Sequence, residues 1–177
     1  MENEIIRGGQ FIVKNSKCED IFTPEDFTEE QKMMKDAVME FNDREIIPFR
    51  DRFENKDYAF TEGIMRKAGA LGFLGVAVPE AYGGLGMGFV STLLTCDYIS
   101  SGTGSFSTAF GAHTGIGTMP ITLYGSEEQK QKYVPKLANG EWFGAYCLTE
   151  PTAGSDANSG RTKAVLSEEL AVIVGVK

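Results

Sequence analysis

Hydrophobic and polar residues follow a helical period along most of this chain, up to about residue 140. The strongest stripe has the i, i+3, i+4, i+7 spacing of one helix face and consists of Met34, Ala37, Val38 and Phe41. Thr28 and Gln31 have the spacing of a capping box, which is typical of a helix N-terminus. The pattern therefore predicts a helix that begins at Thr28 and that Pro48 interrupts or kinks.

Further helical segments are predicted at residues 61–71, 89–100, 105–117 and 118–124, and from the cap Ser126 to Asn139-Gly140. Residues 98–126 contain no Asp, Glu, Lys or Arg and carry glycines at 102, 104, 111, 115, 117 and 125. A glycine inside a helix costs about 1 kcal/mol relative to alanine. This stretch is therefore interpreted as buried helices whose glycines allow a neighbouring backbone or a ligand to approach closely.

Four segments are predicted to be extended: residues 11–13, 76–79, 143–149 and 162–166, the last as the strand partner of 143–149. The change from helical to extended texture near residue 141 marks one domain border. We expect an extended arm (residues 1–26), a helical domain (27–141) and the beginning of a β-domain (142–177).

The composition is that of a soluble globular chain, with 42% hydrophobic and 24% charged residues among 177. A net charge of -8 and a pI near 4.8 argue against nucleic acid or an anionic membrane as partner. Three cysteines without CxxC spacing favour reduced thiols and a cytoplasmic location. The single histidine argues against a metal site, and we find neither a secretory signal nor an apolar run of membrane-spanning length.

Residues 146–156 have the residue types of a strand that runs into an anion-binding turn. Thr149 ends the strand with a hydroxyl, Pro151 fixes the turn, and residues 153–155 bring backbone N–H groups together without bulk. Clustered N–H groups form a concave anion site that suits a pyrophosphate. Gly-Ser-Asp sequences are also common in plain β-turns, so residue types alone leave both interpretations open.

The same segment resembles the signature of the acyl-CoA dehydrogenase family. That signature is a small residue, an aliphatic one, Ser or Thr, Glu, two variable positions, a small residue, Gly, Ser or Thr, and Asp. The matching positions are Cys147, Leu148, Thr149, Glu150, Ala153, Gly154, Ser155 and Asp156. Residues 78–86, 119–121 and 124–130 also resemble family segments, and the likeness covers roughly residues 25 to 167.

The resemblance implies a mainly α fold: the N-terminal helical bundle domain of the family, followed by the first strands of an incomplete β-domain, with FAD held between them. Carried over by position, the cofactor-binding residues are Tyr146, Cys147, Leu148, Thr149, Glu150, Pro151, Thr152, Ala153, Gly154 and Ser155. Leu148 and Thr149 would touch the isoalloxazine ring, and Gly154 and Ser155 would lie nearer the pyrophosphate. Ser155 would also bind the pantetheine arm of the substrate.

The resemblance further implies that helix 109–118 forms the wall of an acyl pocket. The implied reaction, of the fatty-acid β-oxidation type, oxidises an acyl-CoA thioester to the 2,3-enoyl-CoA. A carboxylate base removes the α-proton while the β-hydride passes to FAD. An electron-transfer protein as acceptor and a homo-oligomeric enzyme are implied as well.

In the family the base is a Glu of a C-terminal bundle, and no residue of this sequence matches it. We therefore assign no catalytic residue and expect these 177 residues alone to be an incomplete, inactive enzyme. Glu150 and His113 are interpreted as structural residues.

Two alternatives stay open beside this interpretation. One is a non-catalytic helical interaction module with the family fold, and the other is a flavin oxidase or monooxygenase relative. The apolar run in residues 168–177 departs from the family pattern and is a β-prone segment without an assured partner.

Overall fold

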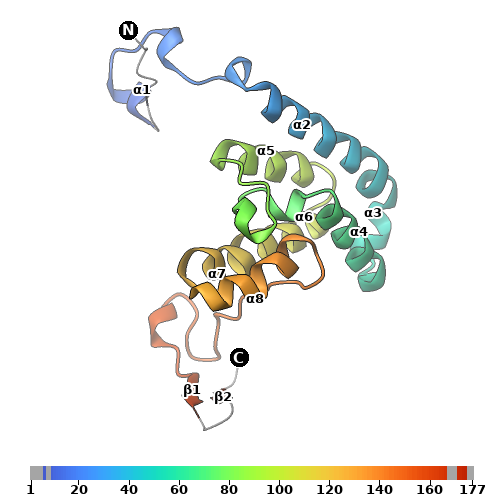
Figure 1. Ribbon diagram of the computed structural model, residues 1–177, viewed down its shortest axis with the longest axis vertical. Helices are drawn as coiled ribbons and strands as arrows, with labels where there is room; N and C mark the ends of the chain where they lie inside the picture. Colours follow the sequence, from blue (N-terminus) through green and yellow to red (C-terminus); the bar gives the residue numbers. More distant parts are fainter. Residues whose placement is uncertain (1–5, 7–8, 167–170, 175–177) are drawn as a thin grey trace.

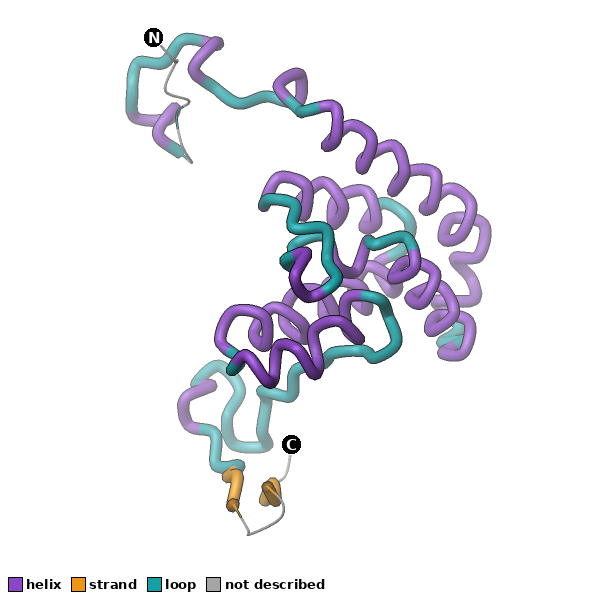
Figure 2. Tube along the Cα trace, viewed as in Figure 1, coloured by secondary structure: helices purple, strands orange, loops and turns teal. Residues whose placement is uncertain are grey.

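The computed structural model describes residues 6, 9–166 and 171–174, and most of them are helical (Figures 1 and 2). The α-helices are α1 (Gln10–Val13), α2 (Glu29–Phe41), α3 (Arg50–Glu54), α4 (Tyr58–Ala70), α5 (Phe89–Ser100), α6 (Gly104–Gly111), α7 (Met119–Tyr124) and α8 (Glu127–Ala138). Two π-helical segments, Asn42–Ile46 and Ala112–Thr118, interrupt them. The strands β1 (Lys163–Leu166) and β2 (Ala171–Val174) form an antiparallel pair. The prediction of a mainly α fold is confirmed.

Helices α2 to α8 gather in one body, and the N-terminal arm and the β1–β2 hairpin project from its opposite ends (Figure 1). Short 3-10 turns connect the longer elements at Cys18–Asp20, Pro24–Asp26, Ile47–Phe49, Phe73–Gly75, Glu80–Tyr82 and Ala157–Ser159. Within the described residues, no helix has the length and apolar character that a membrane crossing requires.

The predicted helix starts at Thr28 and Ser126 are confirmed, and both use capping boxes. Thr28 Oγ1 accepts a hydrogen bond from the amide of Gln31 at 3.2 Å, and the Gln31 side chain accepts one from the amide of Thr28 at 3.0 Å. Ser126 and Gln129 repeat this arrangement at the start of α8. These local bonds satisfy amides that a helix N-terminus leaves open, which is why the sequence predicts both starts well.

The predicted break at Pro48 is also confirmed, although the chain departs from α-helical geometry before the proline. After α2 the chain widens into the π-helical segment Asn42–Ile46, tightens into the 3-10 turn Ile47–Phe49, and then forms α3. Helix α5 has the predicted bounds, whereas α4 begins earlier than predicted. The side chain of Asp57 caps α4 by accepting from the amide of Phe60 at 3.1 Å.

Two of the predicted extended segments are wrong. Residues 11–13 belong to α1, because the amide of Lys14 bonds locally to the carbonyl of Gln10 at 2.9 Å. Residues 76–79 form turns instead of a strand. A strand requires a neighbouring strand for its amides and carbonyls, and both segments satisfy these groups nearby. Residues 1–5 and 7–8 of the predicted arm lie outside the described residues.

The predicted pairing of residues 143–149 with 162–166 is wrong as well. Residues 143–149 have no regular secondary structure, and among the described residues they pair with no strand. The strand prediction for 162–166 is confirmed by β1, but its partner is β2, with Lys163 opposite Val174 and Leu166 opposite Ala171. Strand β1 thus pairs with β2, which follows it closely in the chain, and not with residues 143–149. The rest of the apolar tail, 167–170 and 175–177, lies outside the described residues.

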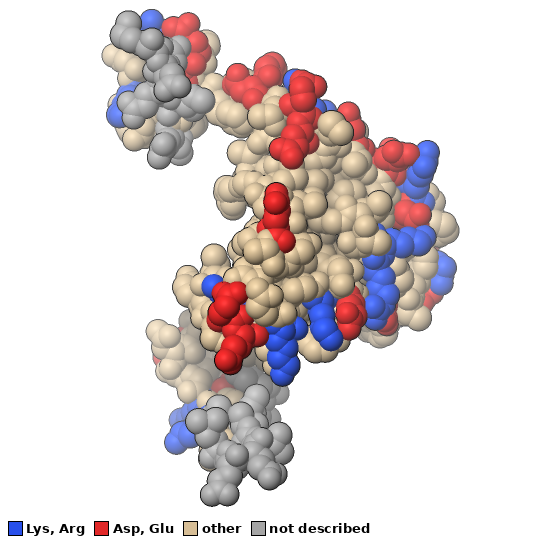
Figure 3. Space-filling model, viewed as in Figure 1, with Lys and Arg blue, Asp and Glu red and all other residues tan. Residues whose placement is uncertain are grey.

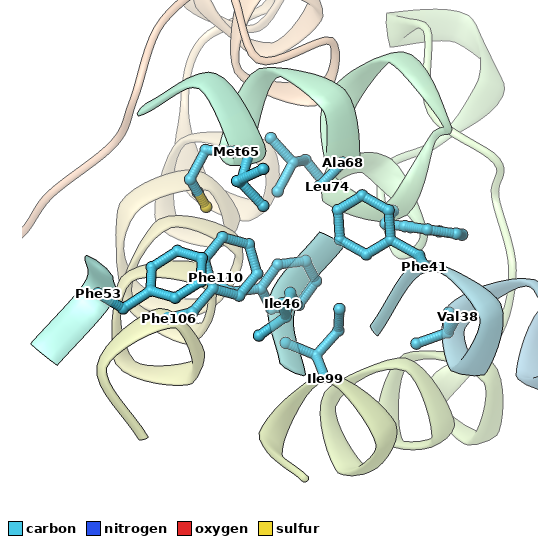
Figure 4. Close-up of a cluster of buried hydrophobic side chains, with 12 residues drawn as sticks. Val38, Phe41, Ile46, Phe53, Met65, Ala68, Leu74, Ile99, Phe106 and Phe110 are labelled. Atoms are coloured by element: carbon cyan, nitrogen blue, oxygen red, sulfur yellow. The ribbon is translucent and has the colours of Figure 1, made fainter. Parts of the chain in front are cut away.

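The core joins α2 to α6 through a cluster of buried apolar side chains (Figure 4). Its members are Val38, Phe41, Ile46, Phe53, Ile64, Met65, Ala68, Phe73, Leu74, Ile99, Phe106 and Phe110. Phe106 has ring neighbours on two sides, Phe53 at 5.3 Å and Phe110 at 6.4 Å between ring centres. Helix α6 is thereby held in the middle of the body, and it leads directly into the glycine-rich π-helical segment.

Replacing Phe106 with alanine is expected to lower the free energy of unfolding of the 177-residue chain by about 3–5 kcal/mol, because the ring is fully buried and leaves a cavity. Chemical denaturation measures the change. Met33→Ala on α2 is the control, since Met33 is 72% exposed and its loss should change stability by less than about 0.5 kcal/mol. Equal losses in both variants would contradict the assignment of the core.

Candidate active site

The signature segment lies where the chain leaves α8 and crosses to the β1–β2 hairpin (Figure 1). Residues 145–149 are all exposed, with Tyr146 at 55% and Leu148 at 44%. Among the described residues, Tyr146, Cys147 and Thr149 have no hydrogen-bond partner. Apolar side chains and open backbone groups therefore face outward together, as a surface that binds a flat ligand requires.

A β-turn follows this exposed run and occupies part of the predicted anion site. The amide of Ala153 donates to the carbonyl of Glu150 at 3.1 Å, and the amide of Glu150 donates to the carbonyl of Ala153 at 3.0 Å. Pro151 takes the second position of the turn, which its fixed φ favours. Of the three predicted N–H groups, that of Ala153 is used inside the turn, and those of Gly154 and Ser155 lie on exposed residues.

The carboxylate of Glu150 closes the following loop onto itself. Its side chain is 7% exposed and accepts backbone hydrogen bonds from Arg161 at 2.6 Å and Thr162 at 3.0 Å. The two ends of the loop 151–160 are thus held together through the Glu150 carboxylate. Within the loop, the hydroxyl of Ser159 donates a hydrogen bond to the carboxylate of Asp156. These bonds support the structural interpretation of Glu150, because a carboxylate engaged with two amides is poorly placed to remove a substrate proton.

His113 is buried at 2% exposure and uses both ring nitrogens. Nδ1 accepts a hydrogen bond from the amide of Gly144 at 3.0 Å, so the ring proton is assigned to Nε2, which lies 3.0 Å from the carbonyl of Leu137. Burial lowers the pKa of this imidazole, and the bond to Leu137 opposes that effect in part. The prediction that His113 is a packed, hydrogen-bonded core residue is confirmed.

The glycines of the segment 109–118 have two different roles. A Cβ on Gly117 would lie 2.5 Å from the carbonyl carbon of Gly144, so this position admits the close approach of two backbones. A Cβ on Gly111 or Gly115 would meet nothing within 4 Å. The sequence left open whether these glycines make room for a neighbouring backbone or for a ligand. In the structure, Gly117 makes room for the backbone of Gly144.

Gly111 and Gly115 line an apolar cavity of about 430 Å³ between α5, α6 and the π-helical segment. No Asp, Glu, Lys or Arg lines it among the described residues; its walls include Phe73, Leu74, Val78, Met87, Cys96, Phe110, Thr114 and Met119. The hydroxyls of Thr95 and Thr114 each donate to the carbonyl four residues earlier, at 2.9 Å. The cavity therefore presents hydrocarbon to whatever enters it.

Charged side chains are unevenly spread over the face that Figure 3 shows. Lys and Arg lie mostly along the convex right-hand edge and the lower part of the body, whereas Asp and Glu also lie on the upper part and beside the hollow. All three cysteines are free, and burial raises the pKa of the Cys96 thiol. In the described part of the chain, no three His, Cys, Asp or Glu residues are close enough to hold a metal ion.

Comparisons with known proteins agree with this arrangement. The family defined as "Acyl-CoA dehydrogenase, N-terminal domain" matches residues 28–141. The chain is 45% identical over 165 residues to a probable acyl-CoA dehydrogenase of Bacillus subtilis (strain 168), covering 93% of this chain and 28% of that protein. It is 37% identical over 139 residues to the mitochondrial isovaleryl-CoA dehydrogenase of Solanum tuberosum, covering 78% of this chain and 34% of that protein.

The fold is similar to the crystal structure of an acyl-CoA dehydrogenase complexed with FAD from Bacillus anthracis. The TM-score is 0.87 at 42% sequence identity, and the match covers 96% of this chain and 29% of that one. The chain thus spans about a third or less of the length of these relatives. With the signature, the helical body and the apolar cavity in the same chain, this protein belongs to the acyl-CoA dehydrogenase family.

Proposed function

We propose that this chain is the N-terminal part of an FAD-dependent enzyme that oxidises an acyl-CoA thioester to its 2,3-enoyl-CoA. The observation that carries the proposal is the connection between the cavity and the signature segment. Gly115 lines the cavity, and Gly117 in the same π-helical segment packs against Gly144, from which the exposed run 145–149 begins. The cavity and the exposed run thus both adjoin the segment Ala112–Thr118, and this proximity is what hydride transfer from an acyl chain to the cofactor requires.

The residues of the signature fit FAD. Bound FAD supplies the acceptor for the β-hydride. We assign binding of the cofactor to residues 146–155, with Leu148 and Thr149, which are both exposed, towards the flavin ring. The amides of Gly154 and Ser155 suit the pyrophosphate, because both residues are exposed and the space beside Gly154 is open. Glu150 contributes by holding the loop that carries them.

The substrate side of the proposal rests on the apolar walls of the cavity. A charged acyl group would find no counter-ion there among the described residues, so an uncharged aliphatic chain fits best. Ser155, whose side chain is exposed, is assigned to the pantetheine arm. No described carboxylate lines the cavity, and we propose that the base comes from protein outside these 177 residues.

The remaining expectations belong to the same proposal. They are the division into residues 1–26, 27–141 and 142–177, a homo-oligomeric enzyme, an electron-transfer protein as acceptor, and a cytoplasmic location, which the three free thiols favour.

The 177-residue chain alone is expected to be colourless after purification and unable to reduce an electron-acceptor dye with acyl-CoA. The physical reason is that only the beginning of the β-domain expected to hold FAD lies in these 177 residues, and that the base is assigned to protein outside them. Absorbance near the flavin bands and a dye-reduction assay measure this, with the complete protein as the positive control. A yellow, active preparation of the short chain would contradict the proposal.

Replacing Gly115 with leucine is expected to shorten the acyl chains that the complete enzyme accepts, because the new side chain enters open space in the cavity. We expect kcat/KM for the longest accepted thioester to fall about tenfold or more relative to a short one. A series of acyl-CoA lengths measures the shift. Gly63→Ala on α4 is the control, since Gly63 also has open space around it but does not line the cavity. An unchanged length preference in Gly115→Leu would contradict the assignment of the cavity.

Replacing Glu150 with glutamine is expected to loosen the clasped loop, because an NH₂ group then faces one of the two amides that the carboxylate accepts. The loss should be about 1–3 kcal/mol of local stability. Amide hydrogen exchange at Arg161 and Thr162 measures it, with Glu128→Gln on an exposed residue of α8 as the control. Unchanged exchange at both amides would show that Glu150 does not hold the loop.

A further inference from the structure

His113 is the point at which three segments of the chain meet. Its own segment, Ala112–Thr118, lines the cavity through Thr114 and Gly115. Through Nε2 it reaches the carbonyl of Leu137 near the end of α8, and through Nδ1 it accepts from the amide of Gly144. One buried side chain therefore ties the wall of the cavity, the last helix and the start of the signature segment together.

The chain between α8 and the signature is held from two sides before it becomes exposed. Arg66 on α4 donates to the carbonyls of Gly140 at 3.0 Å and Glu141 at 3.3 Å, and its guanidinium lies 5.3 Å from the ring centre of Phe143. The rings of His113 and Phe143 also meet in an edge-to-face arrangement, with 5.8 Å between ring centres.

Gly144 is the last fixed point of this connection. It donates its amide to His113 and packs its backbone against Gly117, and the exposed run 145–149 begins directly after it. A chain fixed at one residue confines the next few, because consecutive Cα atoms are only about 3.8 Å apart. The hydrogen bond at Gly144 is thus well placed to set where Tyr146 and its neighbours lie relative to the cavity.

We propose that His113 is a positioning residue for the cofactor site: its Nδ1 holds the amide of Gly144 and so sets the place of residues 145–149 against the wall of the acyl cavity. The reference to cofactor and substrate rests on the proposed function, whereas the holding of Gly144 does not. His113 touches neither reacting group, so its effect passes through Gly144.

Histidine suits this position because its acceptor and its donor nitrogen lie at different distances from Cβ along the side chain. Nδ1 is two bonds from Cβ, as is the side-chain oxygen of asparagine, and Nε2 is three bonds from Cβ, as is the side-chain nitrogen of glutamine. His113→Asn can therefore keep the acceptor for Gly144 while losing the donor to Leu137. His113→Gln can keep the donor to Leu137 while losing the acceptor. The two variants separate the two hydrogen bonds.

The first experiment measures residue-resolved amide hydrogen exchange of the 177-residue chain. In His113→Gln we expect exchange at Gly144 to rise roughly fivefold to tenfold or more, as for the loss of one hydrogen bond, while His113→Asn stays near the wild type. A role in packing alone would not produce this contrast. Equal exchange in the two variants, or the reverse order, would overturn the proposal.

A second measurement needs no variant and so remains informative if a substitution prevents folding. The ¹⁵N chemical shifts of the imidazole report which nitrogen carries the proton. We expect Nδ1 to be unprotonated and Nε2 protonated. A proton on Nδ1 in the folded chain would overturn the proposal, because that nitrogen could not then accept from Gly144.

The last experiment measures FAD affinity of the complete protein with each variant. We expect His113→Gln to raise the dissociation constant about tenfold and His113→Asn to change it by much less. If the exchange contrast appears but FAD affinity is equal in both variants, the positioning of the cofactor site is overturned. If the wild-type protein binds no FAD while the exchange contrast appears, the proposed function fails and the hydrogen bond at Gly144 stands.

Discussion

A chain that leaves a helical body without entering a sheet must still satisfy its buried backbone groups, and this constraint organises the site. Between Asn139 and Gly144 neither helix nor strand is available. The amides of Gly140 and Trp142 bond to carbonyls of α8, and side chains supply partners for other groups. Arg66 donates to two carbonyls and His113 accepts from one amide. The run 145–149 can be exposed because the residues before it are held by these bonds.

The same constraint separates what the sequence could predict of the fold from what it could not. Helices whose N-termini are closed by neighbours in the sequence, as at Thr28 and Ser126, are predicted well because the bonds are local. Residues 143–149 have the extended texture of a strand, but whether they form one depends on a partner elsewhere in the chain. The partner predicted for them, β1, pairs with β2 instead. Local pattern contains no information about that competition.

The candidate site divides in the same way. The signature and the glycine-rich segment were recognisable from residue types, and the structural interpretation of His113 and Glu150 followed from their surroundings in the sequence. The clasp of Glu150 on Arg161 and Thr162 was not predictable, because eleven and twelve residues separate the partners. Likewise, residue types cannot distinguish Gly117, which admits a backbone, from Gly115, which lines a cavity. The sequence contained one signal for the close approach at Gly117. Gly144, which also lacks a side chain, directly precedes the exposed run 145–149.

Both π-helical segments end two residues before a proline, and the second of them carries His113. Segment Asn42–Ile46 precedes Pro48, and segment Ala112–Thr118 precedes Pro120. A proline cannot donate to the carbonyl four residues earlier and its ring crowds that carbonyl, so a widened turn relieves the conflict. In the second segment the hydroxyl of Thr118 donates to the carbonyl of His113 at 2.8 Å, which fixes the widened turn at the histidine. The widened segment that precedes Pro120 therefore carries both cavity-lining residues, Thr114 and Gly115, and the imidazole that holds Gly144.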